Sequence, residues 1–127
     1  KVLPSNRREF GATSIEIAGD DPLFHGLKGR TTVWMSHGDQ VRDLPAGFRN
    51  LAETSTCPHA AVRHTESGFR GLQFHPEVTH TPEGRTIINN FLYLVCGCVG
   101  DWTSSTNVAV LFVSFDSMIK FSWSRMT

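Results

Sequence analysis

The sequence predicts a chain with both strands and a helix, in which a β-rich stretch of short strands is followed by one amphipathic helix. Two observations carry this prediction. Between residues 10 and 75, short runs of β-branched and aromatic residues alternate with turns built on Gly, Pro and Asp, which favours antiparallel or mixed strand pairing. From residue 82 to residue 95, apolar residues recur instead at the spacing of one helix face.

The strands are expected in five segments joined by short turns. Residues 20–27, with the sequence DDPLFHGL, predict a turn or one short helical turn, opened by Asp21-Pro22 and closed by Gly26. A further turn is expected at GDQ, residues 38–40, and a hairpin-like turn at SGF, residues 67–69. The expected strands cover residues 10–17, 31–36, the run after the Pro-x-Gly turn at 45–47, 60–64 and 69–75.

The helix has start and stop signals of its own. Thr81 is the expected N-cap, Pro82 the first helical residue, and Glu83 an acidic residue that suits the helix macrodipole. Gly97 is the expected stop. The apolar face is formed by Ile87, Ile88, Phe91, Leu92 and Val95.

Composition and charge fit one small globular domain with a modest core. Apolar residues make up 39% of the 127 residues, and twelve basic residues balance twelve acidic ones, so no nucleic-acid partner is expected. The longest apolar run is far too short to cross a membrane, so no membrane partner is expected. Three cysteines are too few for a disulfide framework, which favours a reducing compartment and a cytoplasmic location.

The segment LQFHPEVTHT, residues 72–81, joins an alternating apolar run to His75, Pro76 and Glu77. Residues two apart in an extended chain point to the same side, so His75 and Glu77 are expected to lie side by side. Pro76 donates no hydrogen bond, so the strand should end here. A carboxylate that accepts from one imidazole nitrogen leaves the other free for proton transfer. An isolated His-x-Glu is more often a surface hydrogen bond, so the neighbouring motifs decide between these interpretations.

Six motifs stand in a fixed order. They are RREFG (7–11), VWMSHGDQV (33–41), LPAGF (44–48), CPHAAV (57–62), QFHPEVTHT (73–81) and NFLYLVCGCVGDWT (90–103). QFHPEVTHT resembles the histidine–glutamate segment of the class I glutamine amidotransferases, whose triad is cysteine, histidine and glutamate. The whole set resembles the amidotransferase domain of the GMP synthetase family, over roughly residues 1–103. Amidotransferases that serve other biosynthetic enzymes share HPE but not the whole set.

This resemblance implies site roles residue by residue. His75 would be the general base and acid, with Glu77 as its orienting partner. The SHGD segment would help to hold the α-amino and α-carboxylate groups of glutamine. Its residues are Ser36, His37, Gly38 and Asp39.

The resemblance also implies an α/β fold with a mixed, flavodoxin-like sheet and flanking helices. This chain would be its C-terminal portion, and the opening KVLPS, which starts on Lys1, agrees with a fragment. Residues 1–103 are interpreted as a partial amidotransferase domain and residues 104–127 as a divergent tail that does not resemble the family. A chain without the first parallel strands exposes an apolar edge, so marginal stability is expected.

The family's nucleophilic cysteine stands on a GxCxG elbow, and that motif does not occur in this sequence. Cys57 lies in STCPH, whereas Cys96 and Cys98 lie in CGCVG. The chain alone is therefore expected to be inactive, because losing the nucleophile costs about as much activity as losing the whole triad. Two alternatives stay open: a catalytically dead fragment or regulatory or binding remnant, and an amidotransferase subunit of another biosynthetic enzyme.

The implied substrate is glutamine, whose ammonia would serve the ATP-dependent amination of XMP to GMP in purine biosynthesis. No cofactor is expected in this chain. The resemblance assigns ATP and Mg²⁺ to an ATP-pyrophosphatase (synthetase) domain or subunit, which is the implied partner. That domain carries an SGGVDS-like phosphate loop, which this sequence lacks. A homodimer formed through the absent C-terminal domain is also consistent with the family.

Two patterns invite a metal interpretation. Cys96 and Cys98 supply only half of the four ligands that structural zinc generally takes, so small residues closing a helix are the favoured interpretation. His-x-Glu also occurs in zinc deaminases, but these need a downstream Pro-Cys-x-x-Cys that the sequence lacks. No metal site is therefore expected.

Overall fold

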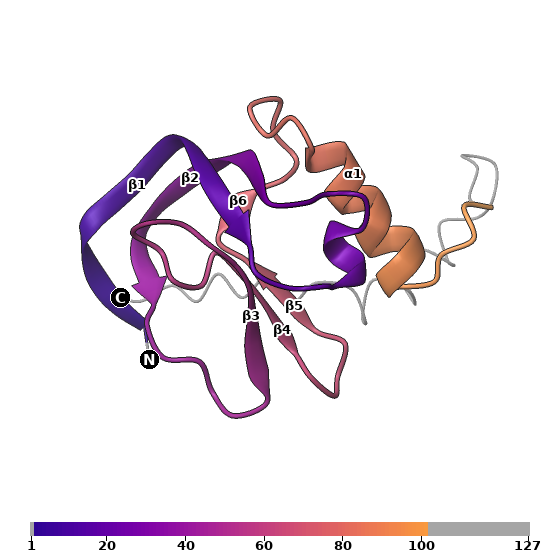
Figure 1. The fold of residues 1–127 in the computed structure, drawn as a ribbon, viewed down its shortest axis with the longest axis horizontal. Helices are drawn as coiled ribbons and strands as arrows, with labels where there is room; N and C mark the ends of the chain where they lie inside the picture. Colours follow the sequence, from indigo (N-terminus) through magenta and orange to yellow (C-terminus); the bar gives the residue numbers. More distant parts are fainter. Residues whose placement is uncertain (1, 102–127) are drawn as a thin grey trace, which may run out of the picture.

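The computed structural model describes the backbone of residues 2–101 and the side chains from Arg8 to Asp101. The expected divergent tail and Trp102 lie outside the described residues. Within the described part, six strands form one sheet, and a helix follows the last strand (Figure 1). No helix in this part of the chain is long and apolar enough to cross a membrane.

Neighbouring strands of the described sheet pair antiparallel, which is one of the two arrangements that the short turns predict. Their order is β5-β4-β3-β1-β2-β6. The strands are β1 (Val2–Ile17), β2 (Arg30–Val41), β3 (Phe48–Glu53), β4 (Ala61–His64), β5 (Arg70–Leu72) and β6 (Phe74–His75).

The two edge strands are neighbours in the sequence, because only Gln73 separates β5 from β6. β5 pairs with β4 at one edge of the sheet, whereas β6 pairs with β2 at the other. The sheet therefore has to curl until its two edges approach each other. The expected single strand over residues 69–75 is wrong in this respect, because the change of pairing partner divides it in two. The same change carries the chain to His75 at the end of β6.

β1 and β2 are longer than the sequence predicts. The expected turn at residues 38–40 is wrong, because β2 continues through them to Val41, and Asp39 and Gln40 pair with Pro4 and Leu3 of β1. β1 in turn begins at Val2 rather than near Phe10. Pairing between two distant segments thus overrides the local turn preference of Gly38 and Asp39.

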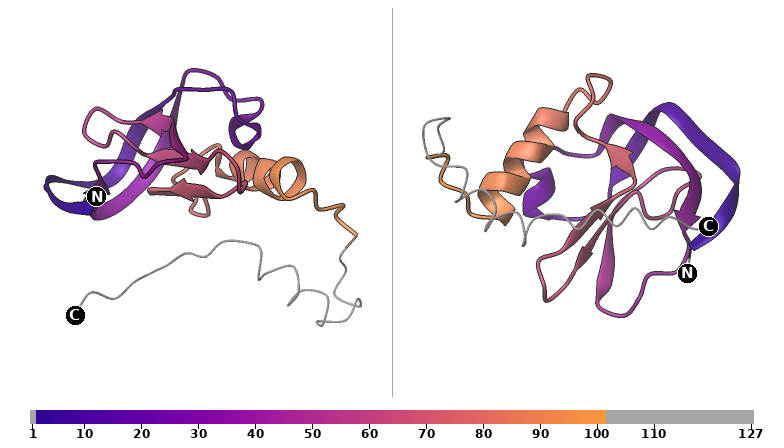
Figure 2. Two further views of the ribbon diagram at one scale, coloured as in Figure 1. Left: turned by 90° about the horizontal axis from the view of Figure 1, so that it is seen from below. Right: turned by 180° about the vertical axis from the view of Figure 1, so that it is seen from behind.

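One continuous helix follows β6 and lies to one side of the strands (Figure 2). It consists of α1 (Gly84–Asn89) and the π-helical segment η2 (Asn90–Val95). The expected cap at Thr81 is wrong, because Glu83 occupies the N-cap position and makes no side-chain capping bond. The expected stop is confirmed: Gly97 follows the helix with a φ of 68°, which favours glycine.

A buried carboxylate anchors the connection between β1 and β2. The expected helical turn is η1 (Pro22–Phe24), and Asp21 caps it by accepting a hydrogen bond from the Leu23 N–H. Arg63 and Arg70 also donate to this carboxylate, whose side chain is 0% exposed. Burial by itself raises the pKa of Asp21, but the hydrogen bonds from Leu23, Arg63 and Arg70 outweigh it, so the pKa lies below its ordinary value.

The core joins the sheet to the helix. On the helix, the buried Asn90 donates from Nδ2 to the Leu23 and His25 carbonyls, which ties η2 to η1 and its C-cap. The buried apolar residues are Ile15, Leu23, Phe24, Val33, Met35, Leu51, Ala52, Cys57, Ala60, Ala61, Phe74 and Ile87.

Candidate active site

His75 and Glu77 lie where β6 ends, as the sequence predicts. His75 Nδ1 is 2.8 Å from Glu77 Oε1, and Pro76 separates the two residues. Their side chains are 38% and 60% exposed, so both groups face solvent rather than the core. The predicted proximity of these two side chains is confirmed.

The hydrogen bond determines which ring nitrogen is available for chemistry. An ionised carboxylate only accepts, so the hydrogen between the two groups belongs to Nδ1 of His75. Nε2 has no hydrogen-bond partner among the described residues. Glu77 therefore presents His75 with Nε2 free to take or give a proton.

β2 supplies the residues beside this pair. Trp34 pairs directly with His75 across β2 and β6, so the two side chains share one face of the sheet. Ser36 is two residues along β2 and exposed, which places it on the same face. Asp39 is also exposed and Gly38 is half-buried. The SHGD segment thus runs along the strand that pairs with the His75 strand.

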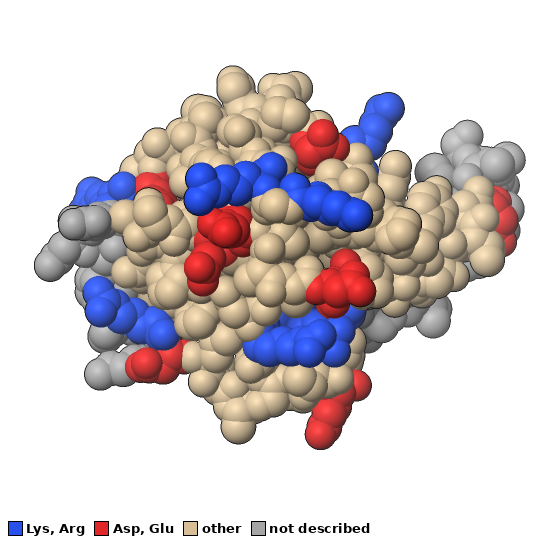
Figure 3. All heavy atoms as spheres, in the orientation of Figure 1, with Lys and Arg blue, Asp and Glu red and all other residues tan. Residues whose placement is uncertain are grey.

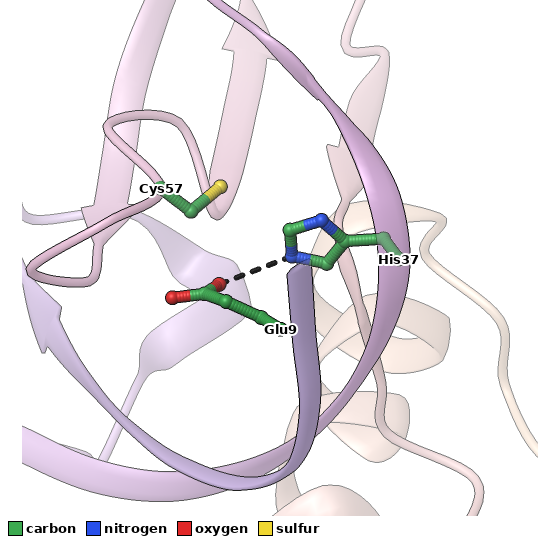
Figure 4. A group of neighbouring side chains, drawn as sticks. All are labelled: Glu9, His37 and Cys57. Atoms are coloured by element: carbon green, nitrogen blue, oxygen red, sulfur yellow. Dashed lines mark hydrogen bonds and ion pairs between the residues drawn. The ribbon is translucent and has the colours of Figure 1, made fainter. Parts of the chain in front are cut away.

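His37 faces the other way. Its side chain is only 7% exposed, and Nε2 lies 3.1 Å from Glu9 Oε2. Nδ1 lies 3.0 Å from the Asp39 carbonyl oxygen. Figure 4 shows Glu9 and His37 pointing toward each other, with the Cys57 sulfur directed at the same space. The ring of His37 is therefore an interior group, whereas its neighbours in SHGD are accessible.

The Glu9 cluster, defined as Glu9, His37 and Cys57, has donor atoms within 4.8 Å of one another. Such donors suit zinc. However, the hydroxyls of Thr54 and Thr56 donate to Glu9 Oε1, while Oε2 faces His37. Both carboxylate oxygens and both ring nitrogens thus already have protein partners. Glu9 and His37 therefore belong to a buried hydrogen-bond network among the described residues.

The three cysteines differ in exposure. Cys57 is buried, and that burial raises the pKa of its thiol above the ordinary value. Cys96 and Cys98 are free and exposed just beyond the helix. Cys57 is therefore a thiol of the core, whereas solvent reaches Cys96 and Cys98.

Thr81 and Gly84 contact the backbone of the HPE segment, and sequence reasoning missed this role. The Thr81 hydroxyl accepts from the Trp34 N–H and donates to the His75 carbonyl. Gly84 packs against Pro76. These contacts join residues of different elements, which the local sequence does not predict. The local pattern Thr-Pro-x-Gly indicates only the start of a helix.

The surface beside Glu77 is open and carries an acidic and a basic side chain, Glu77 and Arg85. A shallow depression adjoins Glu77 and is bordered by Val78, Thr79, Arg85 and Ile88. On the face drawn in Figure 3, basic and acidic side chains are interspersed. Neither sign of charge dominates that face.

Known proteins share both the sequence and the fold. A family model for glutamine amidotransferase class-I matches residues 1–95. The chain belongs to the class I glutamine amidotransferase family. GMP synthase (glutamine-hydrolyzing) of Aliivibrio fischeri is 48% identical over 106 residues, which cover 84% of this chain and 20% of that protein. The enzyme of the same name from Acetivibrio thermocellus is 49% identical over 101 residues, 80% of this chain and 20% of that protein.

Solved structures agree with this family. The crystal structure of a GMP synthase subunit from Thermoplasma acidophilum superposes with a TM-score of 0.72 at 34% identity, covering 76% of this chain and 49% of that one. A glutamine amidotransferase from Thermotoga maritima has a TM-score of 0.55 at 23% identity and shows the fold alone. The expected α/β amidotransferase fold is thus confirmed. This amidotransferase spans about a fifth of the length of the curated relatives it matches.

Proposed function

We propose that this amidotransferase chain supplies the histidine and the glutamate of the glutamine-hydrolysing site of a GMP synthase. The observation that carries the proposal is the 2.8 Å contact between His75 Nδ1 and Glu77 Oε1 at the end of β6. The identity of nearly half to GMP synthases over most of the chain supports the choice of enzyme.

The chemistry follows from the free Nε2 of His75. In the complete enzyme, a cysteine thiolate attacks the side-chain amide carbon of glutamine. The C–N bond breaks as His75 donates a proton from Nε2 to the departing ammonia. Water then adds to the thioester while Nε2 takes its proton, which releases glutamate and regenerates the thiolate. Glu77 holds the Nδ1 hydrogen through both steps.

The nucleophile is proposed to come from outside these 127 residues. Cys57 is buried, and its raised pKa favours the unreactive thiol over the thiolate. Cys96 and Cys98 stand in CGCVG rather than in GxCxG. The chain thus contributes two of the three triad groups and is inactive on its own.

The SHGD segment is the proposed glutamine-binding strand. Ser36 shares the face of His75, and the exposed Asp39 supplies a carboxylate for an α-ammonium group. Gly38 has no side chain, so substrate can approach the backbone of β2 at this residue. His37 contributes through its buried bonds to Glu9 and to the Asp39 carbonyl, which fix the segment from behind.

The ammonia is proposed to serve amination of XMP to GMP in a synthetase domain or subunit. The names of the curated relatives support this step, since they are GMP synthases. The sequence contains no SGGVDS-like phosphate loop. ATP and Mg²⁺ are proposed to bind that partner.

The test compares this chain with the full-length protein from the same gene. Glutamate and ammonia release should be measurable for the full-length protein and absent for the 127-residue chain. Turnover by this chain alone would contradict the assignment of the nucleophile. No turnover by either protein would favour the competing hypothesis, a catalytically dead remnant.

A further inference from the structure

The turn that carries His75 and Glu77 is fastened by a side chain from the loop that follows it. Thr81 is only 3% exposed. Its hydroxyl accepts a hydrogen bond from the Trp34 N–H over 3.0 Å and donates one to the His75 carbonyl over 2.6 Å. Since Trp34 and His75 are paired across β2 and β6, one hydroxyl bonds to both strands at the residue that ends β6.

A second contact fastens the next residue. A Cβ added at Gly84 would lie 1.9 Å from the Pro76 carbonyl oxygen and 2.9 Å from its carbonyl carbon. Those atoms are backbone, so a side chain at Gly84 requires the HPE segment or α1 to shift. The Gly84 N–H donates to the Thr81 carbonyl over 2.9 Å, which links the two contacts.

These contacts matter because the His75–Glu77 hydrogen bond is exposed. A contact between two exposed side chains contributes little to stability and does not hold them in one geometry unaided. β6 is only two residues long, so regular strand pairing adds little support. The backbone at His75 and Pro76 therefore has to be fixed from elsewhere.

We propose that Thr81 and Gly84 are positioning residues that hold the His75–Glu77 pair in its reactive geometry. Thr81 fixes the backbone on the histidine side, and Gly84 fixes it at Pro76. This inference rests on the proposed glutaminase function, but the geometry it predicts is measurable without catalysis.

The experiment uses the full-length protein with Thr81→Val, which keeps the shape and removes the hydroxyl, and Thr81→Ser, which restores the hydroxyl. Displacement of a catalytic group by about 1 Å costs up to about 10²-fold. Thr81→Val should therefore lower the kcat of glutamine hydrolysis by about 10- to 100-fold with KM within about twofold, and Thr81→Ser should recover most of it. Gly84→Ala should lower kcat similarly.

Matched controls separate positioning from general damage. Thr65→Val removes an exposed hydroxyl from the turn between β4 and β5, and Gly19→Ala adds a methyl where nothing lies within 4 Å. Both should retain the parent kcat. Circular dichroism should show that every variant is folded.

A second readout is the pair of ¹⁵N imidazole signals of His75, recorded in the same proteins. Thr81→Val and Gly84→Ala should shift them, whereas the controls should not. Folded variants with unchanged His75 signals and unchanged kcat would overturn the proposal. Shifted signals in a protein whose hydrolysis does not depend on His75 would preserve the positioning role and reject only the proposed function.

Discussion

At the scale of single residues, the role proposed for Glu77 combines its charge with its hydrogen bond to His75. Glu77→Gln keeps an oxygen that accepts from His75 Nδ1 but removes the charge that stabilises the imidazolium. In the full-length protein it should lower kcat for glutamine hydrolysis by about 10²-fold and change KM little. Glu66→Gln, at an exposed turn, is the matched control. Equal activity of the Glu77 variant and the control would remove Glu77 from the site.

The charge of Asp21 supports the fold through two arginines. Asp21 is a buried carboxylate held by Arg63 and Arg70, and removing one partner of such a group leaves buried charges uncompensated. Asp21→Asn should lower the free energy of unfolding at pH 7 by roughly 3 kcal/mol, measured by urea titration. Asp20→Asn, at the exposed neighbouring position, should have almost no effect. Similar losses in the two variants would contradict this account.

The pH dependence of that contribution follows from the lowered pKa of Asp21. A carboxyl whose pKa falls on folding stabilises the fold fully above its unfolded pKa of about 3.9. The contribution is then lost as the pH falls through the folded value. The difference in stability between the parent and Asp21→Asn should therefore shrink between pH 5 and the acid limit, roughly as carboxylates protonate. A difference that grows on acidification would show the opposite linkage.

At the scale of elements, Asn90 fastens the helix to η1. Its Nδ2 donates to two carbonyls, of Leu23 and His25, and both lose that partner in Asn90→Ala. The substitution should lower the free energy of unfolding by about 2 kcal/mol, because unsatisfied buried polar groups are costly. Asn89→Ala changes the exposed neighbour on the same helix and should cost far less. Thermal denaturation of the two variants measures both losses, and equal losses would contradict the role of Asn90.

The elements that the sequence predicts well are those with local signals. The η1 turn has Asp21 and Pro22, and the hairpin turn before β5 has Gly68, whose φ is 67°. The helix face repeats at helical spacing. The extension of β2 through Gly38 depends on pairing with the start of β1, and the division at Gln73 depends on two different partners. No local pattern reports such long-range pairing.

The contacts of the candidate site likewise include some that the sequence predicts and some that it does not. His75 and Glu77 are two residues apart on an extended chain, so their contact is predictable from spacing alone. The inward direction of His37 depends on its pairing partner, since Glu9 stands opposite it on β1. The Thr81 contacts reach 47 residues back to Trp34, and the helix-start signal around Thr81 pointed to a different role.

At the scale of the whole molecule, the reactivity of the cysteines measures how often the folded chain opens and exposes its core. Cys57 is buried with a raised pKa, whereas Cys98 is exposed. Alkylation of the chain by iodoacetamide, followed by mass spectrometry, should modify Cys98 quickly and Cys57 only after denaturation. Rapid modification of Cys57 in buffer would indicate frequent opening and would support the expected marginal stability.

The proposed function concerns a protein longer than this chain. The chain covers about a fifth of the GMP synthases it resembles, and within that fifth it carries His75 and Glu77 on an exposed strand end. The proposed nucleophile lies outside these 127 residues, so the claim is tested in the full-length protein.

The most direct measurement is the His75→Ala variant of the full-length protein, assayed with glutamine and, separately, with free ammonia as the nitrogen donor. We predict that glutamine-dependent formation of GMP from XMP and ATP falls by at least about 10²-fold. Ammonia-dependent formation should stay at the parent level, because the synthetase step does not use His75. Undiminished glutamine-dependent activity would contradict the assignment of His75 as the acid–base group.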